Sequence, residues 1–306
     1  MQNEKMLMYE AATLYYDKKL TQQEIAHRMK LSRQTVSKLL NDALRENIVE
    51  ITIHNPEKDR QSLEQQICSV FGIDRCVVCN VASRDDSIRR LMTVKAAAQY
   101  ILPIIQKGNL KIGLSWGRTI DEFIRLLPHT ATSGNTVFPL FGATDHETSY
   151  FSSNELARSM ADKIGARLQC AWFPYRTDSE EDCVLLKKLS YYNKMQALWS
   201  SADLVILGIG NTETLENLAN TFGYSEKHSQ AIGDLATHFF DTNGQLVHLY
   251  DNTLCASEED IQTAKQSVAI ACGKEKAQAI AGALRTRMIN TLITDEYTAK
   301  EILAHS

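Results

Sequence analysis

The chain has 306 residues, of which 44% are hydrophobic and 23% charged, and its formal net charge is −4. This length has room for one large or two domains with proper cores, and the composition excludes a disordered chain. The mildly negative charge excludes a generally basic nucleic-acid-binding body, so any DNA contact must come from a local patch.

The sequence also limits where the protein works. No apolar run approaches membrane-spanning length, and the first residues, MQNEKMLMYE, lack the charged-then-apolar pattern of a signal peptide. Seven cysteines, an odd number scattered through apolar stretches, fit reduced thiols better than a disulfide framework. We therefore expect a cytoplasmic protein.

Residues 21–40, TQQEIAHRMKLSRQTVSKLL, predict a helix-turn-helix. Thr21 and Glu24 have the spacing of a capping box, which starts a short helix. Its apolar face contains Ile25 and Met29, with small Ala26 where a second helix must cross closely. Lys30-Leu31 makes the turn, and Ser32 is a good N-cap for the next helix.

The second helix has an inward apolar stripe and a polar outer face. The stripe consists of Val36, Leu39, Leu40 and Ala43 at helical spacing. Polar side chains on the other face can bond base edges or phosphates in the major groove. The alternative is an ordinary surface helix pair with solvated charges. Because cap, crossing residue, turn and polar face agree, we expect double-stranded DNA as a partner, contacted by Ser32, Arg33, Gln34, Thr35, Ser37 and Lys38.

A wing and a domain boundary are predicted next. Alternating apolar residues over Asn47–Ile53 suggest a strand or hairpin packed as a wing. The composition then turns to a charged helix, Glu57–Phe71. We place the boundary near Asn55, which gives a helix-turn-helix domain at 1–54 and a larger domain at 55–306.

The larger domain alternates apolar strands with amphipathic helices. This alternation predicts an α/β fold with a largely parallel sheet covered on both faces, and ligands in such sheets bind beyond the carboxyl ends of the strands. The predicted strands are Cys76–Cys79, Lys111–Leu114, Thr136–Leu140, Leu168–Phe173, Leu204–Leu207, Leu246–Leu249, Ser267–Ala271 and Ile289–Ile293. The predicted helices are Ile88–Ile105, Thr119–Leu127, Asn154–Ile164, Ser257–Lys265 and Glu275–Arg285.

Several predicted strands end in turns that suit a phosphate. After the second strand, Ser115, Gly117, Arg118 and Thr119 open a helix, which offers backbone amides, hydroxyls and a positive charge. Further turns with glycine follow other strands, and Asp234 is a candidate partner for sugar hydroxyls. Purely structural turns are the alternative. We favour a phosphorylated small sugar, bound also by Gly142, Ala143, Thr144, Gly208, Gly210, Asn211 and Lys276.

Metal and redox chemistry are not expected. Cys76 and Cys79 have a pair spacing, but they sit in an apolar run and no second pair follows at zinc-ribbon spacing. The eight histidines are dispersed, and none has the spacing of a helical zinc site. We therefore predict no cofactor and no metal.

The chain resembles the SorC family of bacterial sugar-responsive transcription regulators. The resemblance rests on the helix-turn-helix, KIGLSWGRTI, DLVILGIGN, IGDLATHFFDTNG and the block SVAIACGKEKAQAIAGALRTRMINTLITDEYTAKEIL, in the same order along nearly the whole chain. It implies an effector domain related in fold to sugar-phosphate isomerases, a dimer or tetramer, and control of sugar-catabolic operons. It also implies a phosphate at Ser115–Thr119, with Lys276 and Asp234 as the basic and acidic positions of the site.

Two other classes stay open at this stage. A fold of this kind also houses isomerases, so a sugar-phosphate isomerase-like enzyme with an accessory DNA-binding domain is the main alternative. A nucleic-acid-binding structural protein needs only the first domain. A DNA-binding domain fused to a ligand pocket makes sensing the more economical reading, with repression and activation both possible.

Overall fold

The computed structural model describes residues 2–50, 56–131, 134–144, 152–223 and 225–306. The chain separates into two compact units, Met1–Asn55 and Pro56–Ser306. Each unit has its own buried hydrophobic cluster.

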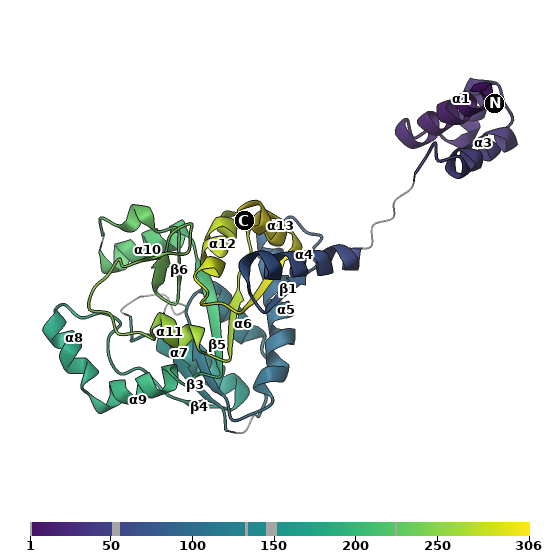
Figure 1. Ribbon diagram of the computed structural model, residues 1–306. Coiled ribbons are helices and arrows are strands. Elements are labelled where there is room, and N and C mark those ends of the chain that lie inside the picture. The colour runs from purple at the N-terminus through teal and green to yellow at the C-terminus, as the bar shows by residue number, and fades with distance from the viewer. Residues whose placement is uncertain (1, 51–55, 132–133, 145–151, 224) are drawn as a thin grey trace. The chain divides into compact units, whose positions relative to one another are not determined.

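The first unit is helical (Figure 1). It contains α1 (Gln2–Ala12), the π-helical turn η1 (Thr13–Asp17), α2 (Gln22–Met29) and α3 (Arg33–Arg45). The capping box of Thr21 and Glu24 is confirmed, and Ser32 caps α3 by accepting from the amide of Thr35. Lys30 takes the left-handed conformation, with φ of 56°, that lets α2 turn into α3.

The wing prediction is wrong for the part of Asn47–Ile53 that the structure describes. Asn47 is left-handed, and the amides of Ile48 and Val49 both donate to the carbonyl of Ala43. The segment 47–49 therefore closes the end of α3 as a turn instead of forming a strand. Residues 51–53 lie outside the described residues.

The second unit is built on a parallel sheet, as predicted. Its strand order is β1-β10-β9-β5-β2-β3-β4, and every pair along this path is parallel. The bounds are β1 (Arg75–Cys79), β2 (Lys111–Leu114), β3 (Thr136–Pro139), β4 (Arg167–Leu168), β5 (Leu204–Gly210), β9 (Gln266–Ile270) and β10 (Thr291–Asp295). Buried aliphatic side chains fill the central strands, as expected for a sheet covered on both faces.

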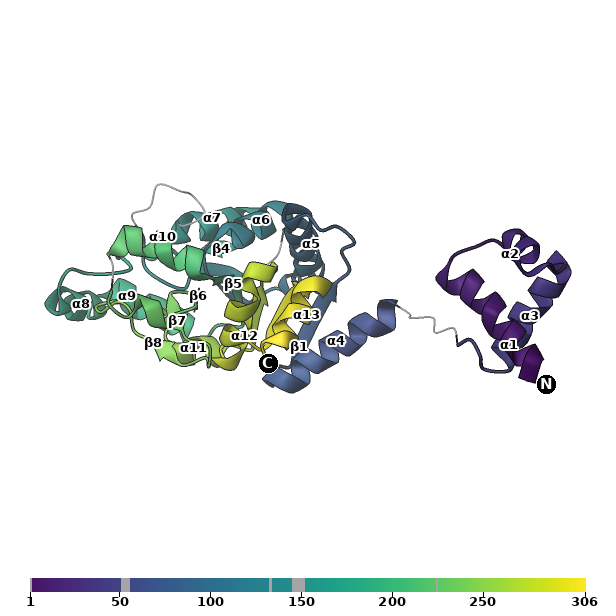
Figure 2. The same ribbon diagram turned by 90° about the horizontal axis from the view of Figure 1, so that it is seen from above.

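Helices cover both faces of the sheet. Figure 2 shows α5, α6 and α7 on one side and α4, α12 and α13 on the other. The helices of this unit are α4 (Pro56–Phe71), α5 (Asp86–Ile105), α6 (Arg118–Leu126), α7 (Ser153–Ile164), α8 (Glu180–Lys187), α9 (Ser190–Trp199), α10 (Thr212–Phe222), α11 (Glu258–Gln262), α12 (Ala277–Arg285) and α13 (Glu296–Ala304), with 3-10 turns η3 (His228–Gln230) and η4 (Lys274–Lys276).

A small antiparallel extension continues from the end of β5. It contains β6 (Gly233–Leu235), β7 (His238–Phe240) and β8 (Leu246–Val247). In its register Gly210 lies opposite Asp234. The sheet thus delivers Asp234 to the same edge at which the parallel strands end.

Some predicted elements are shorter than expected. The strand predicted at Leu168–Phe173 is only the two-residue β4, because Asn154 of α7 takes up both the amide and the carbonyl of Ala171. The predicted strand Leu246–Leu249 shrinks to β8, and the predicted helix Ser257–Lys265 shrinks to α11. The last predicted helix begins as η4 and becomes α-helical only at Ala277.

Candidate nucleic-acid interface and ligand cavity

The outer face of α3 is exposed as the sequence predicts. Val36, Leu39 and Leu40 are buried in the first unit, while Arg33, Gln34 and Lys38 are exposed on the other side of the helix. The hydroxyls of Ser32 and Thr35 lie 2.7 Å apart, so the cap already engages both. The longer side chains are therefore the better candidates for reaching base edges.

A polar hollow lies on the surface of the first unit, at the starts of α2 and α3. It is lined by Tyr15, Tyr16, Lys19, Leu20, Thr21, Gln22, Gln23 and Arg33. In a helix-turn-helix the second helix is the recognition helix that enters the major groove, and the first helix crosses the DNA backbone. Lys19 and Arg33 give this hollow two basic side chains, which makes it a candidate for contact with a DNA phosphate.

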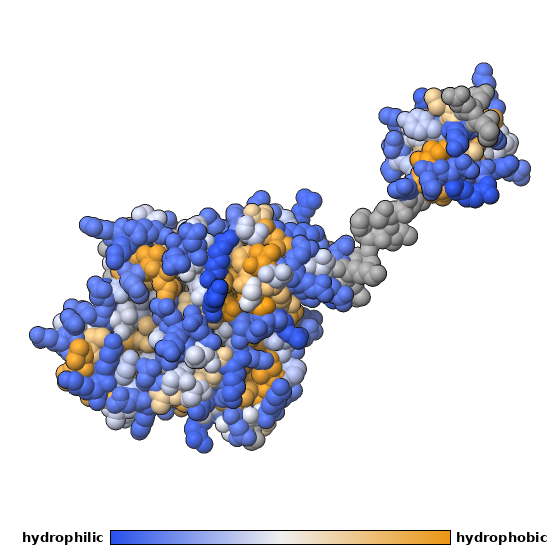
Figure 3. All heavy atoms as spheres, viewed as in Figure 1, coloured by the Kyte–Doolittle hydropathy of each residue, from blue (hydrophilic) through white to orange (hydrophobic). Residues whose placement is uncertain are grey.

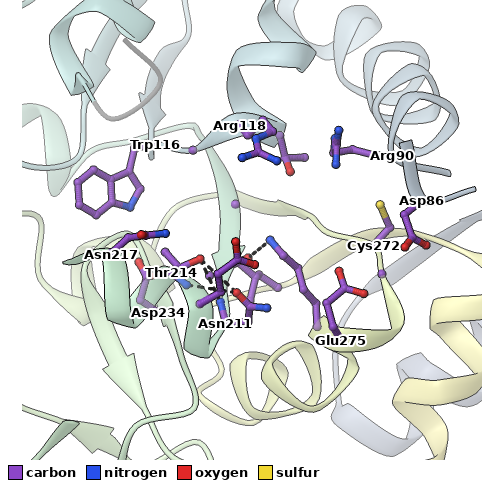
Figure 4. Close-up of a pocket in the computed structure, with 18 residues that line it drawn as sticks. Asp86, Arg90, Trp116, Arg118, Asn211, Thr214, Asn217, Asp234, Cys272 and Glu275 are labelled. Atoms are coloured by element: carbon purple, nitrogen blue, oxygen red, sulfur yellow. Dashed lines mark hydrogen bonds between the residues drawn. The ribbon is translucent and has the colours of Figure 1, made fainter. Parts of the chain in front are cut away.

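The second unit contains a cavity of about 200 Å³ at the carboxyl ends of β2, β5 and β9 (Figure 4). It is lined by Asp86, Arg90, Trp116, Gly117, Arg118, Thr119, Gly208, Ile209, Gly210, Asn211, Glu213, Thr214, Asn217, Asp234, Cys272, Gly273, Glu275 and Lys276. Its position agrees with the general rule for ligands of open parallel sheets.

Two helices begin at the cavity wall. Gly117 is the N-cap of α6, with φ of 110° and no side-chain cap, and Asn211 caps α10 through the amide of Thr214. A helix start carries partial positive charge and is a common seat for anions. Arg118 and Lys276 add basic side chains to the same wall.

Asp234 and Lys276 form the charged centre of the cavity. Burial raises the pKa of Asp234 to about 6, against the hydrogen bonds from Thr237 and Trp116 and the charge of Lys276. Burial also lowers the pKa of Lys276, which the charges of Cys272 and Asp234 oppose. The Nζ of Lys276 donates to the carbonyl of Ile209 at 2.9 Å. The cavity therefore holds a lysine and a carboxylate that a polar ligand would stabilise.

One carboxylate oxygen of Asp234 has no partner within the part of the chain that the structure describes. The Oδ1 atom is buried and makes no hydrogen bond there, although the residue lines the cavity. A β-carbon on Gly210 would lie 1.9 Å from this oxygen, so only glycine fits beside it. A buried acceptor of this kind favours a ligand that donates a hydroxyl hydrogen.

Hydrogen bonds to the start of α13 fix the loop after β9. The amide of Gly273 donates to Oγ1 of Thr298 at 2.8 Å, and the Thr298 hydroxyl donates to Asp295, which caps α13. Gly273 itself has φ of 116°. This network fixes the loop that brings Lys276 to the cavity.

The structure brings together most of the predicted ligand residues. The cavity lining includes eight of them, namely Gly117, Arg118, Thr119, Gly208, Gly210, Asn211, Asp234 and Lys276. Ser115 lies behind the wall: it is 1% exposed, and its hydroxyl accepts from the amide of Gly208 at 2.9 Å. It therefore ties β2 to β5 and does not face the cavity.

The turn at Gly142–Thr144 also lies outside the lining. The amide of Gly142 donates to Leu254, and Ala143 exchanges backbone hydrogen bonds with Phe173 and Tyr175. A β-carbon on Gly142 would lie 2.3 Å from the carbonyl of Pro174. This glycine is required by close backbone packing.

Other lining residues escaped the sequence analysis. Asp86 and Arg90 come from α5, and Thr214 and Asn217 come from α10. The Nε of Arg90 donates to both carboxylate oxygens of Glu122, each at 2.9 Å, so α6 positions it. Only the i, i+4 spacing of Asp86 and Arg90 after a strand hinted at this contribution.

No metal centre is found among the described residues, where no group of three or more His, Cys, Asp or Glu could hold an ion. Cys76 is buried within β1, and burial raises its pKa. Within the same part of the chain, no helix is long and apolar enough to cross a membrane.

Comparisons with known proteins cover both units. Residues 55–304 match the family model Sugar-bind, described as "Putative sugar-binding domain", and residues 12–46 match sigma-70 region 4. The chain is 28% identical to the sorbitol operon regulator of Klebsiella pneumoniae and 26% identical to the deoxyribonucleoside regulator of Bacillus subtilis (strain 168), in each case over 97% of both chains. The crystal structure of the full-length sorbitol operon regulator from Klebsiella pneumoniae matches 98% of this chain and 99% of its own, with a TM-score of 0.73.

Proposed function

Because the chain belongs to the SorC family of transcriptional regulators with a sugar-binding domain, we propose that a phosphorylated small sugar in the cavity of the second unit switches DNA binding by the first. The DNA-binding residues proposed are those of the α3 face: Ser32, Arg33, Gln34, Thr35, Ser37 and Lys38. The regulated genes are those of a carbohydrate-catabolic operon.

The chemistry of the cavity wall is the observation that supports a sugar phosphate as the ligand. The cavity wall combines two kinds of group: the starts of α6 and α10, with Arg118 and Lys276, favour a dianion, while Oδ1 of Asp234 needs a hydrogen-bond donor. A phosphate joined to a polyhydroxylated chain satisfies both. Neither an inorganic anion nor a neutral sugar alone does so.

An enzyme of the isomerase type is not supported. The relatives that match along their full length are regulators. The shared fold is used here for sensing, and the buried pair of Asp234 and Lys276 serves recognition of the ligand.

We also propose a homo-oligomer, a dimer or tetramer, that acts in the cytoplasm, where the operator lies. One helix-turn-helix offers few base contacts, and specific binding usually uses two half-sites related by a two-fold axis. The unit from residue 55 onward would bind the effector and hold the oligomer together.

Thermal unfolding with a panel of sugars tests the ligand. A sugar phosphate should raise the unfolding temperature of the wild type, because a ligand that binds only the folded state stabilises it. Lys276→Ala should lose this shift, and the unphosphorylated form of the same sugar should give little. Equal shifts with phosphorylated and unphosphorylated sugars would contradict the proposal. Catalytic turnover of a sugar phosphate would instead support the alternative that the protein is an isomerase-like enzyme.

A further inference from the structure

The helical hairpin of α8 and α9 presents apolar side chains to solvent. Leu185 is 60% exposed, Val184 46% and Leu189 46%, and Tyr191 at the start of α9 is 54% exposed. Figures 1 and 2 both show α8 at the margin of its unit, away from α4 and α13, and Figure 3 shows orange atoms gathered there. Exposed apolar surface concentrated in this way marks an interaction site.

The hairpin is nevertheless firmly attached. Cys183 is buried on the inner face of α8, and Leu186 packs against the core from the same face. Tyr192 of α9 packs on Phe173 and Trp199, with ring centroids 5.4 Å and 5.8 Å apart. The outer face of α8 is therefore presented by an ordered helix.

The outer face of α8 has a symmetric pattern. With Cys183 and Leu186 inside, helical spacing places Glu181, Val184, Leu185 and Lys188 together on the outside. The midpoint between Val184 and Leu185 is also the midpoint between Glu181 and Lys188. The stripe thus reads acid, two apolar residues, base, and it is complementary to its own reverse.

We propose that α8 is an interface between two copies of this chain, in which the two α8 helices pack antiparallel about a two-fold axis near Val184 and Leu185. Each Val184 then faces the partner's Leu185. Each Glu181 lies beside Lys188 of the partner subunit, so two identical ion pairs flank the apolar centre. The inference rests on the proposed homo-oligomer and names its surface.

Charge on α8 favours a second copy over another partner. An acidic first turn and a basic last turn also suit the helix dipole, but this preference does not account for the apolar residues between them. Asp182 is engaged by the cap residue Ser179, whereas Glu181 and Lys188 have no ion-pair partner among the residues that the structure describes. Both charges are thus available to the reversed copy.

A competing apolar stripe lies on α5, at Ile88, Leu91 and Met92, which are 45%, 49% and 37% exposed. Of its neighbouring charges, Arg90 pairs with Glu122 and Arg89 stacks over the ring of Tyr297, while exposed Lys95 would lie opposite Ile88 of a reversed copy. The α5 stripe is therefore not self-complementary in charge. It provides the matched control.

Sedimentation velocity of the full chain at micromolar concentration tests the interface. Leu185→Lys should raise the dissociation constant by about tenfold or more, because it places a charge in the apolar centre of both copies. Leu91→Lys, the control on α5, should leave association unchanged. The proposal is overturned if Leu185→Lys associates like the wild type, or if Leu91→Lys is the variant that dissociates.

Charge reversal provides a test that does not depend on loss of packing. Glu181→Lys and Lys188→Glu should each weaken self-association, because each places like charges together at both ends. An equimolar mixture of the two variants should associate, and the double variant should recover the wild-type mass. Failure of the mixture to associate would overturn the proposal.

The same samples separate this inference from the proposed function. The cavity lies within one chain, so its thermal shift with a sugar phosphate should persist in Leu185→Lys. A monomeric wild type that still shows the shift would overturn the interface and leave the sensor intact. A wild type that associates through α8 but shows no shift would reject the sensor alone.

Discussion

At the scale of single residues, Asp234 is the cavity residue whose burial has the clearest free-energy cost. The side chain is 2% exposed, and its Oδ1 atom makes no hydrogen bond within the described part of the chain. Burying a carboxylate without full compensation destabilises the ionised form. We propose that a ligand hydroxyl supplies the missing donor and thereby offsets part of this cost.

The first prediction follows from the raised pKa of Asp234. The folded chain holds this proton up to about pH 6, whereas the unfolded chain releases it at about 3.8. The free energy of unfolding relative to Asp234→Asn should therefore fall as pH rises through this interval, by an amount on the order of 3 kcal/mol, and then level off. Denaturant unfolding of both proteins across this pH range measures it. If the free energies of unfolding of the two proteins changed in parallel with pH, burial would not raise the pKa of Asp234 as described.

The second prediction concerns Gly210. A β-carbon there would meet Oδ1 of Asp234 at 1.9 Å and Cγ2 of Thr214 at 2.9 Å. Gly210→Ala should lower the free energy of unfolding by about 1–3 kcal/mol and abolish the thermal shift with a sugar phosphate. The control is Gly72→Ala, where φ is 67° but no atom lies within 4 Å of the added carbon. The control should lose some stability and keep the shift, and an equal shift in both variants would refute the prediction.

Single residues also show where sequence reasoning succeeds. Arg118 and Lys276 could be placed at the cavity because strand ends of a parallel sheet converge on one edge, whereas Asp234 was singled out only as a candidate partner for sugar hydroxyls, with no strand predicted for it. Ser115 and Gly142 follow strands as well, but close contacts with Gly208 and Pro174 occupy them. Such contacts depend on tertiary packing that a strand-end pattern does not encode.

At the scale of elements, we propose different roles in DNA binding for α3 and the hollow beside it. Exposed Gln34 lies in the middle of the reading face, whereas Lys19 and Arg33 line the hollow at the start of α2. Contacts with bases discriminate between sequences, and contacts with phosphates do not. The two kinds of contact are therefore separable by experiment.

The third prediction contrasts these contacts. Gln34→Ala should relax the preference at one base pair by roughly 1–3 kcal/mol. Lys19→Ala should instead weaken binding to all operators alike and lower the salt dependence by about one phosphate contact. Lys18→Ala is the matched control, since this exposed neighbour does not line the hollow. Fluorescence anisotropy at several salt concentrations distinguishes them. Identical behaviour of the two lysine variants, or an unchanged footprint for Gln34→Ala, would contradict this division.

Elements with strong periodic patterns could be predicted, and irregular ones could not. The helices around Thr21 and Ser32 follow from caps and apolar spacing. The turn joining β6 to β7 consists of Ala236 and Thr237, with φ of 49° and 74°. Hairpin turns of this kind normally carry glycine or asparagine, so no turn signal marked the strand that holds Asp234. The described part of the predicted wing is wrong for a related reason, since the alternation at 47–49 belongs to the turn that ends α3.

At the scale of the whole molecule, regulation by a ligand requires coupling between two compact units that each have their own buried hydrophobic cluster. The cavity lining includes residues of α6, β5, α10, β6 and η4, which are distant in sequence. Binding should draw these segments together and stabilise one arrangement of the second unit. If oligomer geometry depends on that arrangement, ligand and DNA affect each other reciprocally.

Operator affinity with and without the sugar phosphate, measured for the wild type, Thr119→Val and Lys276→Ala, tests this coupling most directly. The wild type should change its operator dissociation constant by roughly 5–150-fold. Both variants should bind DNA normally without ligand and lose the response, Lys276→Ala more completely because a dianion then lacks a charge partner. Variants that respond at the wild-type ligand concentration, or a wild type that responds equally to the unphosphorylated sugar, would contradict the account.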